Sequence, residues 1–323
     1  MSPAATGRWE PAARSSNASW LPPDAVRWGC FNYSEPADVD RELRDLGGAV
    51  FRGDGAVFAV VPARGGESRL YFAARDAVTF ERGLKSAFVG DAAPESLAGG
   101  PETPFPPVIP LRVVIFNLEA LPVAQLARIL VRFKFFPRHH YLDYRLRPLA
   151  SARLVFKGLP GDLAVRRAGD GDVPAIVRFL ETLDPAVAPD PTEVEEAVAA
   201  AAPGAAAAPG PGRAPGAAPG SVILVLDDEK DPSFGAMGFA WVERFGRDGD
   251  HLFLKMLAVS EAYRGKGFGR RLLDEALKWG TEHGCDRAML WVEEDNARAR
   301  RLFESIGFYF SGDEEMHLVR RAV

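Results

Sequence analysis

The second half of the sequence alternates strand-like runs with amphipathic helical stretches, and this order limits the fold more than any other feature. Strands are expected where β-branched and aromatic residues cluster between turn residues, and helices where apolar residues recur at helical spacing. The expected strands cover residues 163–167, 222–226, 237–245, 251–259, 288–292 and 316–319. The expected helices cover residues 172–183 and 192–202, the stretch from 270 to Gly280 or Gly284, and the stretch from a cap at Asn296 to Ile306. This order predicts the α/β class, with an α+β mixed sheet and helices on both of its sides.

A chain of 323 residues favours two domains over one. Residues 199–220 interrupt the second half, because every residue there except Arg213 is Ala, Pro or Gly. Proline and glycine disfavour regular structure and small side chains cannot form a core, so we expect a flexible loop. We also expect a flexible N-terminus over residues 1–20, a first α/β domain over 21–160 and a second domain over 161–323.

Charge and cysteine content argue against several classes of protein. Lys and Arg number 39 and Asp and Glu 44, so the net charge of −5 gives no global basic field, and no nucleic-acid partner is expected. Cys30 and Cys285 lie far apart in the sequence, which argues against a disulfide framework or a Cys-rich zinc site. No apolar run approaches the ~18 to 20 residues of a membrane helix. We therefore expect a cytoplasmic protein that has no membrane partner.

A glycine-rich turn stands between the expected strand at 251–259 and the helix that follows it. Its residues are Arg264, Gly265, Lys266, Gly267, Phe268 and Gly269, followed by Arg270 and Arg271. Glycine lets a ligand approach the backbone closely, and a helix N-terminus offers unpaired N–H groups and the positive end of the helix dipole. Taken alone, the turn fits a phosphate site and a plain strand-to-helix turn equally well. Its spacing matches neither the P-loop nor the dinucleotide-binding glycine pattern.

The turn and three further segments, taken in order, resemble the GCN5-related N-acetyltransferase (GNAT) family. They are Leu257-Ala258-Val259, Arg264-x-x-Gly267-x-Gly269, Asn296-x-x-Ala299-x-x-Leu302-Phe303 and Gly307-Phe308. The expected strand and helix from residue 163 onward are similar to the first elements of that family. The resemblance covers about residues 162–323 and implies the GNAT-like acyl-CoA N-acyltransferase fold, with residues 161–323 as the catalytic domain.

The resemblance implies acetyl-CoA, or another acyl-CoA, as the donor and an amine as the acceptor, with no metal required. The turn residues expected to bind the pyrophosphate are Arg264, Gly265, Lys266, Gly267, Phe268, Gly269 and Arg270. Backbone groups of Leu257, Ala258 and Val259 are expected to hold the pantetheine arm and thioester, with an amide near Leu257 stabilising the oxyanion. Asn296 is expected to bond the pantetheine chain, to cap its helix, or to do both.

The sequence does not clearly assign two catalytic roles, those of the general acid and the general base. Phe303 stands where many relatives have a tyrosine that protonates the departing thiolate, and phenylalanine cannot donate a proton. Tyr263 and Tyr309 are candidate substitutes, although a structural role explains each of them better. The candidate bases are Glu243, His251, Glu293, Glu294 and Asp295, although an acid at a strand end is usually only solvated. An N-acyltransferase acting on a primary amine is the leading interpretation, and a non-catalytic acyl-CoA-binding or sensing module is the alternative.

The first half contains no intact motif. Strands are expected at residues 56–62, 69–74, 112–118 and 141–145, and a helix at 123–133. Residues 128–135 match residues 301–308 at a shift of 173, which predicts a degenerate internal repeat and hence a tandem GNAT arrangement. Residues 80–85 contain an acid and too few glycines for a phosphate loop, so this half is not expected to bind coenzyme A. His139 and His140 are expected to be structural, because adjacent strand residues point to opposite faces. A further interpretation is that this half is a platform that presents a protein substrate. The sequence leaves open whether the chain forms a homodimer.

Overall fold

The computed structural model describes residues 8–11, 19–21, 28–30, 36–53, 55–63, 67–88, 110–116, 122–155, 163–181, 189–200, 220–228, 237–246 and 249–320. The chain divides into two compact units, unit 1 with Met1–Tyr141 and Asp313–Val323, and unit 2 with Leu142–Gly312. This division differs from the expected boundary between residues 160 and 161. Most of the expected loop at 199–220 lies outside the described residues. Residues 8–11 form a strand, which differs from the flexible N-terminus expected over residues 1–20.

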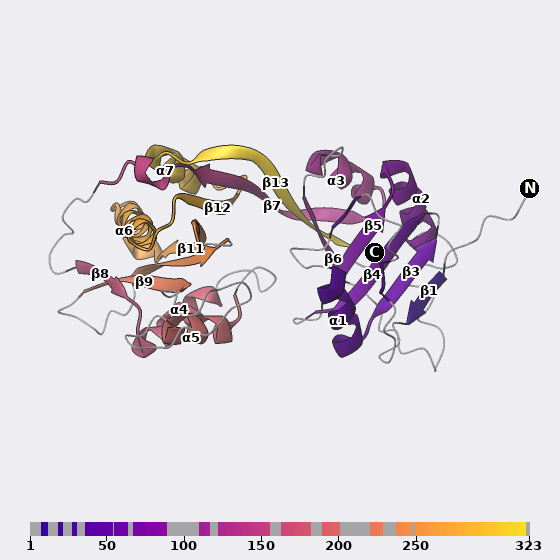
Figure 1. Ribbon diagram of the computed structural model, residues 1–323, viewed down its shortest axis with the longest axis horizontal. Coiled ribbons are helices and arrows are strands. Elements are labelled where there is room, and N and C mark those ends of the chain that lie inside the picture. Colours follow the sequence, from indigo (N-terminus) through magenta and orange to yellow (C-terminus); the bar gives the residue numbers. More distant parts are fainter. Residues whose placement is uncertain are drawn as a thin grey trace, which may run out of the picture. The chain divides into compact units, whose positions relative to one another are not determined.

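Unit 2 is a mixed sheet with helices on both faces (Figure 1). Its strands are β8 (Leu163–Arg167), β9 (Ser221–Asp228), β10 (Gly238–Phe245), β11 (His251–Val259) and β12 (Arg287–Glu293), in that order across the sheet, with β7 (Phe135–Leu146) next to β12. Its helices are α4 (Val173–Leu180), α5 (Pro191–Ala200), α6 (Phe268–Glu282) and α7 (Ala297–Ile306). The predicted strand at 251–259 has the observed bounds, and the mixed sheet is confirmed.

Two apolar clusters hold these layers together. The buried stripe of α6, which includes Leu272, Leu273, Ala276 and Leu277, packs with Phe303 and Ile306 of α7 on one face of the sheet. Ile176 of α4 and Val194 of α5 pack on the other face, against Phe239 and Trp241 of β10. Full burial of one such aliphatic side chain contributes about 1.5–3 kcal/mol, so the two stripes fix which faces the helices cover.

The sheet of unit 2 opens at the ends of β11 and β12. These two parallel strands pair from His251↔Arg287 to Leu254↔Leu290, and their pairing stops there. A bulge lies at the same level, because Trp241 pairs with Met256 while the next residue of β10 pairs with Leu254. Lys255 is the extra residue of this bulge. The last residues of β11 thus have backbone groups on the β12 side that no ladder bond uses.

The strands of unit 1 also pair in both parallel and antiparallel directions. Its strands are β1 (Arg8–Pro11), β3 (Ala49–Gly53), β4 (Ala56–Pro62), β5 (Ser68–Ala74) and β6 (Leu111–Phe116), followed by the last part of β13 (Tyr309–Arg320), with β2 (Trp28–Cys30) paired to β5. Helices α2 (Ala77–Phe88) and α3 (Val123–Val131) contribute to one core, and α1 (Pro36–Leu46) packs on a different cluster. Residues 80–85 therefore lie inside α2 and do not form a loop.

The two units share one element order. In unit 1, β3, β4 and β5 pair antiparallel in turn and β5 pairs in parallel with β6. In unit 2, β9, β10 and β11 pair antiparallel in turn and β11 pairs in parallel with β12. A helix follows the third and the fourth of these strands in each unit. This order agrees with an internal repeat, and the loss of function in the first copy stays a prediction.

The last strands of the two halves cross from one unit to the other. β7 begins in unit 1 and ends in unit 2, whereas β13 begins in unit 2 and ends in unit 1. Within unit 1, Glu315 to Arg320 of β13 pair antiparallel with Phe116 to Leu111 of β6. Each unit is thus completed by a strand that the other half of the chain supplies.

Candidate functional site

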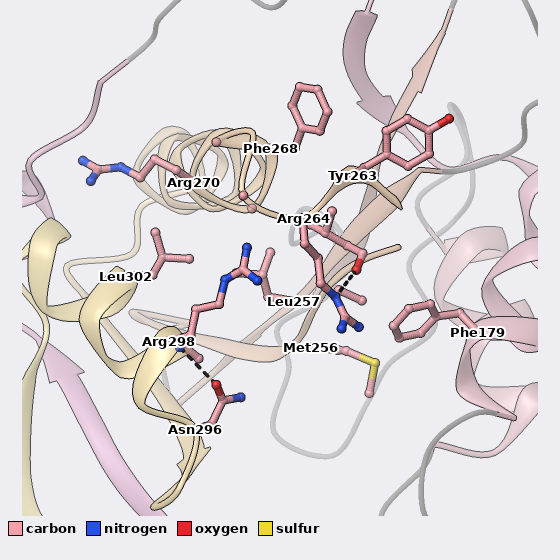
Figure 2. Close-up of a pocket in the computed structure, with 16 residues that line it drawn as sticks. Phe179, Met256, Leu257, Tyr263, Arg264, Phe268, Arg270, Asn296, Arg298 and Leu302 are labelled. Carbon is pink, nitrogen blue, oxygen red and sulfur yellow. Dashed lines mark hydrogen bonds between the residues drawn. The ribbon is translucent and has the colours of Figure 1, made fainter. Parts of the chain in front are cut away.

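A cavity of about 570 Å³ opens in unit 2 where β11 and β12 separate. Its walls are the end of β11, the glycine-rich turn with the start of α6, and the start of α7 (Figure 2). Eleven of the residues predicted for the site line it, namely Leu257, Ala258, Val259, Tyr263, Arg264, Gly265, Gly267, Phe268, Gly269, Arg270 and Asn296. The fold thus brings the strand, turn and helix motifs of the sequence together around one space.

The glycine-rich turn presents bare backbone to this cavity. Gly265 and Gly267 have φ angles of +84° and +88°, a region that favours glycine. Gly267 is the N-cap residue of α6 and has no side chain, so it accepts no hydrogen bond from the first N–H groups of the helix through a side chain. A Cβ at Gly267 would meet nothing within 4 Å. The arrangement leaves room for an anion at the positive end of the helix.

The corresponding helix of unit 1 begins differently. The carboxylate of Asp76 accepts the N–H of Thr79 at 2.8 Å, and the Asp76 N–H donates to the Thr79 hydroxyl at 3.1 Å. The hydrogen bonds from Thr79 lower the pKa of Asp76. An acid of the chain therefore takes the place that α6 leaves open for a ligand.

The cations expected around the turn have different roles. Arg270 is tied to its surroundings, because its Nε donates to Asp274 at 3.0 Å, its Nη1 donates to Ser305 at 3.0 Å, and a further N–H donates to the Arg153 carbonyl. Arg271 pairs with Glu275 at 2.6 Å, and Lys266 lies over the ring of Tyr263 at 5.2 Å. The Arg264 Nε donates to the Val259 carbonyl at 3.0 Å.

Asn296 caps its helix, as predicted, and lies on the cavity wall, whereas its bond to pantetheine stays a prediction. Its side-chain oxygen accepts the N–H of Ala299 at 3.1 Å, which caps α7, and the residue also lines the cavity. Arg298, Ala299 and Leu302 continue this wall along the same helix.

The position of Phe303 corrects one expectation. Its side chain is 4% exposed, belongs to the core cluster and packs edge to face on Phe308 at 5.9 Å, and it is not among the cavity-lining residues. The i, i+3 spacing of α7 brings Ala299 and Leu302 to the cavity, whereas Phe303 is one residue further around the helix. Tyr263 lines the cavity, but Figure 2 shows its hydroxyl pointing away from Leu257 and Met256.

The candidate bases lie elsewhere in unit 2. Glu243 is paired with Lys255 at 3.2 Å, and Lys255 also pairs with Glu193 of α5 at 2.7 Å and lies over the ring of Trp241 at 4.2 Å. His251 shares a hydrogen bond of 2.7 Å with Asp250, which lowers the pKa of that acid. Glu293 ends β12, and Glu294 and Asp295 follow it; like Glu243 and His251, these three residues are absent from the cavity lining. Among the described residues, none of these five candidate bases lines the cavity.

Five lining residues were not among the predicted site residues, namely Phe179, Met256, Arg298, Ala299 and Leu302. Arg298 and Leu302 are four residues apart and therefore lie on the same face of the helix. This spacing could have indicated that Arg298 lines the cavity. Phe179 comes from α4, and its approach to β11 depends on packing between elements far apart in the chain. Within the described ranges, no group of three or more His, Cys, Asp or Glu side chains could hold a metal ion. No helix among those ranges has the length and apolar character needed to cross a bilayer.

Sequence comparisons find similarity in the part of the chain that forms the cavity. Residues 202–308 match the model of the acetyltransferase (GNAT) family. N-alpha-acetyltransferase 40 of Saccharomyces cerevisiae is 46% identical over 65 residues, which are 18% of this chain and 23% of that protein. Mycothiol acetyltransferase of Corynebacterium efficiens is 36% identical over 83 residues, 26% of each protein. The chain thus spans about a quarter of the length of these curated relatives.

Comparisons with solved structures extend over nearly the whole chain. A tandem GNAT protein from the clavulanic acid biosynthesis pathway has a TM-score of 0.55 at 13% identity, covering 97% of this chain and 98% of that one. A GCN5-related N-acetyltransferase from Sphaerobacter thermophilus has a TM-score of 0.54 at 12% identity, covering 89% and 86%. These similarities confirm the predicted fold class.

Proposed function

We propose that this chain, whose residues 202–308 match the acetyltransferase (GNAT) family, transfers an acetyl group from acetyl-CoA to a primary amine. One observation carries the proposal. An uncapped helix N-terminus and an unpaired strand edge face the same cavity, the first suited to a pyrophosphate and the second to an amide-containing arm. Coenzyme A contains both groups in one molecule.

The donor would lie along the cavity from the turn to the opening of the sheet. The N–H groups at the start of α6 would bind the pyrophosphate, and the free edge of β11 at Leu257 to Val259 would hydrogen-bond the pantetheine amides. The thioester would then lie beside Met256 and Leu257, where β11 and β12 separate. A backbone N–H at this point is a preplaced donor for the charge that develops on the carbonyl oxygen.

The reaction needs little from side chains. The amine nitrogen attacks the thioester carbon, the new C–N bond forms, the C–S bond breaks, and the coenzyme leaves as a thiolate. The amine loses one proton and the thiolate gains one, and water can carry both transfers. This scheme fits a cavity whose described lining contains no carboxylate, and it assigns no general base to Glu243 or Glu293. It also assigns no general acid to Phe303.

The names of the relatives suggest the first acceptors to test. The two relatives described above are an N-alpha-acetyltransferase and a mycothiol acetyltransferase. Free peptide N-termini and small amino compounds are therefore suitable probes. A cytoplasmic location and a homodimer stay expectations.

Turnover separates this proposal from a non-catalytic acyl-CoA-binding module. We expect the purified chain to bind acetyl-CoA in a calorimetric titration and to release free thiol in the presence of at least one amine of a panel. Acetylated product should form in equal amount to the released thiol, as measured by mass spectrometry. Binding without release for every amine would favour the binding module, and absence of binding would contradict both interpretations.

A further inference from the structure

Arg298 stands on the wall of the cavity that faces the glycine-rich turn. It lies two residues after the Asn296 cap of α7, and its Nη2 atom is 3.8 Å from the place of a Cβ on Gly265. Figure 2 shows its guanidinium directed away from α7, between that helix and the turn. An arginine on one wall thus lies across from the backbone N–H groups on the other.

The charge of this arginine has no acidic partner among the described residues. Among the residues that the structure describes, no acidic side chain forms an ion pair with Arg298. Arg270 and Arg271 are paired with Asp274 and Glu275 on their own helix. Arg298 is therefore a cation of the cavity whose charge a ligand can neutralise.

We infer that Arg298 binds the pyrophosphate of the donor from the α7 side, opposite the N–H groups of the turn. This inference rests on the proposed function. A guanidinium presents several N–H groups in one plane and suits phosphate oxygens. The pyrophosphate would lie between a helix N-terminus and a guanidinium, so both of its faces would meet donors. Arg298 is thus a donor-binding residue outside the glycine-rich turn.

The test compares three ligands that differ in their phosphates. Coenzyme A has the pyrophosphate and the 3′-phosphate, dephospho-coenzyme A retains only the pyrophosphate, and pantetheine has neither. Binding of the first two is measured by calorimetry and binding of pantetheine by ligand-detected NMR. The variants are Arg298→Gln, Arg298→Lys and the control Arg301→Gln, an exposed arginine of the same helix that does not line the cavity.

We expect Arg298→Gln to weaken both coenzyme A and dephospho-coenzyme A about ten-fold to a hundred-fold, as for the loss of a charge-assisted hydrogen bond. Arg298→Lys should restore part of the affinity, and pantetheine binding should not change. Arg301→Gln should bind all three ligands as the wild type does. The melting temperature of Arg298→Gln should match that of the wild type, because this side chain is exposed.

Three results would overturn the inference while leaving the proposed function intact. They are unchanged binding in Arg298→Gln, an equal loss for all three ligands, and a loss confined to coenzyme A, which would assign Arg298 to the 3′-phosphate. A wild-type chain that binds neither coenzyme A nor dephospho-coenzyme A would overturn the proposed function as well.

Discussion

Gly269 is the residue that tests the donor site with least disturbance to the fold. A Cβ there would meet Val259 Cγ2 at 3.6 Å and Leu302 Cδ2 at 3.8 Å, both ordinary contacts of cavity-lining residues. We expect Gly269→Glu to abolish acetyl-CoA binding in a calorimetric titration, because a carboxylate would enter the space of the pyrophosphate. Gly267 is a poorer choice, because its φ of +88° strains any other residue.

Two variants control this experiment. Gly269→Ala should fold and retain part of the binding, and Gly171→Glu, at a glycine with nothing within 4 Å of its Cβ, should bind as the wild type does. Unchanged acetyl-CoA affinity in Gly269→Glu would contradict the assignment of the cavity.

Phe303 gives the second prediction at this scale. Because its ring lies in the core beside Phe308, Phe303→Tyr adds a hydroxyl among apolar side chains instead of at the thioester. Burying a hydroxyl without a partner costs about 1–3 kcal/mol, so we expect a lower free energy of unfolding in urea. The rate of thiol release at saturating acetyl-CoA should not rise. An increase of ten-fold or more would show that the ring edge reaches the thioester after all.

At the scale of elements, a buried carboxylate fixes the start of α6. Asp274 is fully buried, and it accepts the Arg270 Nε at 3.0 Å and the Val155 N–H at 3.1 Å. We expect Asp274→Ala to lower the free energy of unfolding by about 2–4 kcal/mol, because a guanidinium and an amide lose their acceptor. Glu275→Ala, which breaks the more exposed pair with Arg271, should cost less than about 1 kcal/mol. Equal effects in urea unfolding would contradict this reading of α6.

A second ion cluster predicts how unit 2 responds to acid. Arg166 of β8 donates to Asp172 at 2.7 and 2.9 Å and also to Asp227 of β9. Burial raises the pKa of Asp172, but the hydrogen bonds from Arg166 and from the Gly169 N–H, with the Arg166 charge, hold it below its usual 3.8. A lowered pKa gives stability that is present above the unfolded pKa and is lost as pH falls through the folded pKa.

We therefore expect the melting temperature of the wild type to fall as pH is lowered below about 4. Asp172→Asn should be less stable than the wild type at pH 7 and should lose less stability over the same acid range. Parallel curves for the two proteins from pH 7 to pH 3 would show that this acid does not contribute.

Most elements of unit 2 could be predicted from sequence because their patterns are local. The apolar run of β11, the stripe of α6 and the Asn296 and Gly307 ends of α7 each lie within a few residues of one another. Helix α2 was not predicted, and Gly83 shows why. Glycine weakens a helix by about 1 kcal/mol, yet a Cβ here would lie 2.5 Å from Ala56 Cβ. Glycine is required at residue 83 because β4 lies so close to it. The sequence around Gly83 does not reveal this contact.

The residues of the site also fall into two groups, those that local sequence predicts and those whose position depends on packing between distant elements. The turn and the strand end could be predicted because each of them consists of consecutive residues, whose types alone indicate a phosphate site and a strand edge. The expectation at Phe303 came from the tyrosine position of the GNAT family, and a motif along one helix does not show which of its side chains the neighbouring strands bury. Phe179 reaches the cavity only because α4 packs on β10 through Phe239, at 5.6 Å between the rings.

At the scale of the whole molecule, the crossing of β7 and β13 links the stability of unit 1 to the C-terminal end of the chain. Leu318 is fully buried in the core of unit 1, and Arg320 donates to the Phe133 carbonyl at 3.2 Å. We expect a chain that ends at Gly312 to lose hydrogen-exchange protection in β6 and α3 of unit 1, because β6 loses one of its two ladder partners and keeps only β5. Protection of α6 and β11 in unit 2 should be much less affected.

A point variant tests the same link without truncation. Leu318→Ala should lower the free energy of unfolding by about 2–5 kcal/mol, with its loss of protection concentrated in β6. Tyr309→Ala, at a half-exposed residue of the same strand, is the control. Loss of protection in unit 2 alone would contradict the assignment of residues 313–320 to unit 1.

The path of β13 also sets an order of events during synthesis. A ribosome releases the N-terminal residues first, so β3, β4, β5 and β6 emerge while the strand that will pair with β6 has not yet been translated. Until β13 has been translated and has left the ribosome, β6 presents a bare edge that another nascent chain could join. The sheet of unit 1 is therefore completed only after the strands of unit 2 have been made.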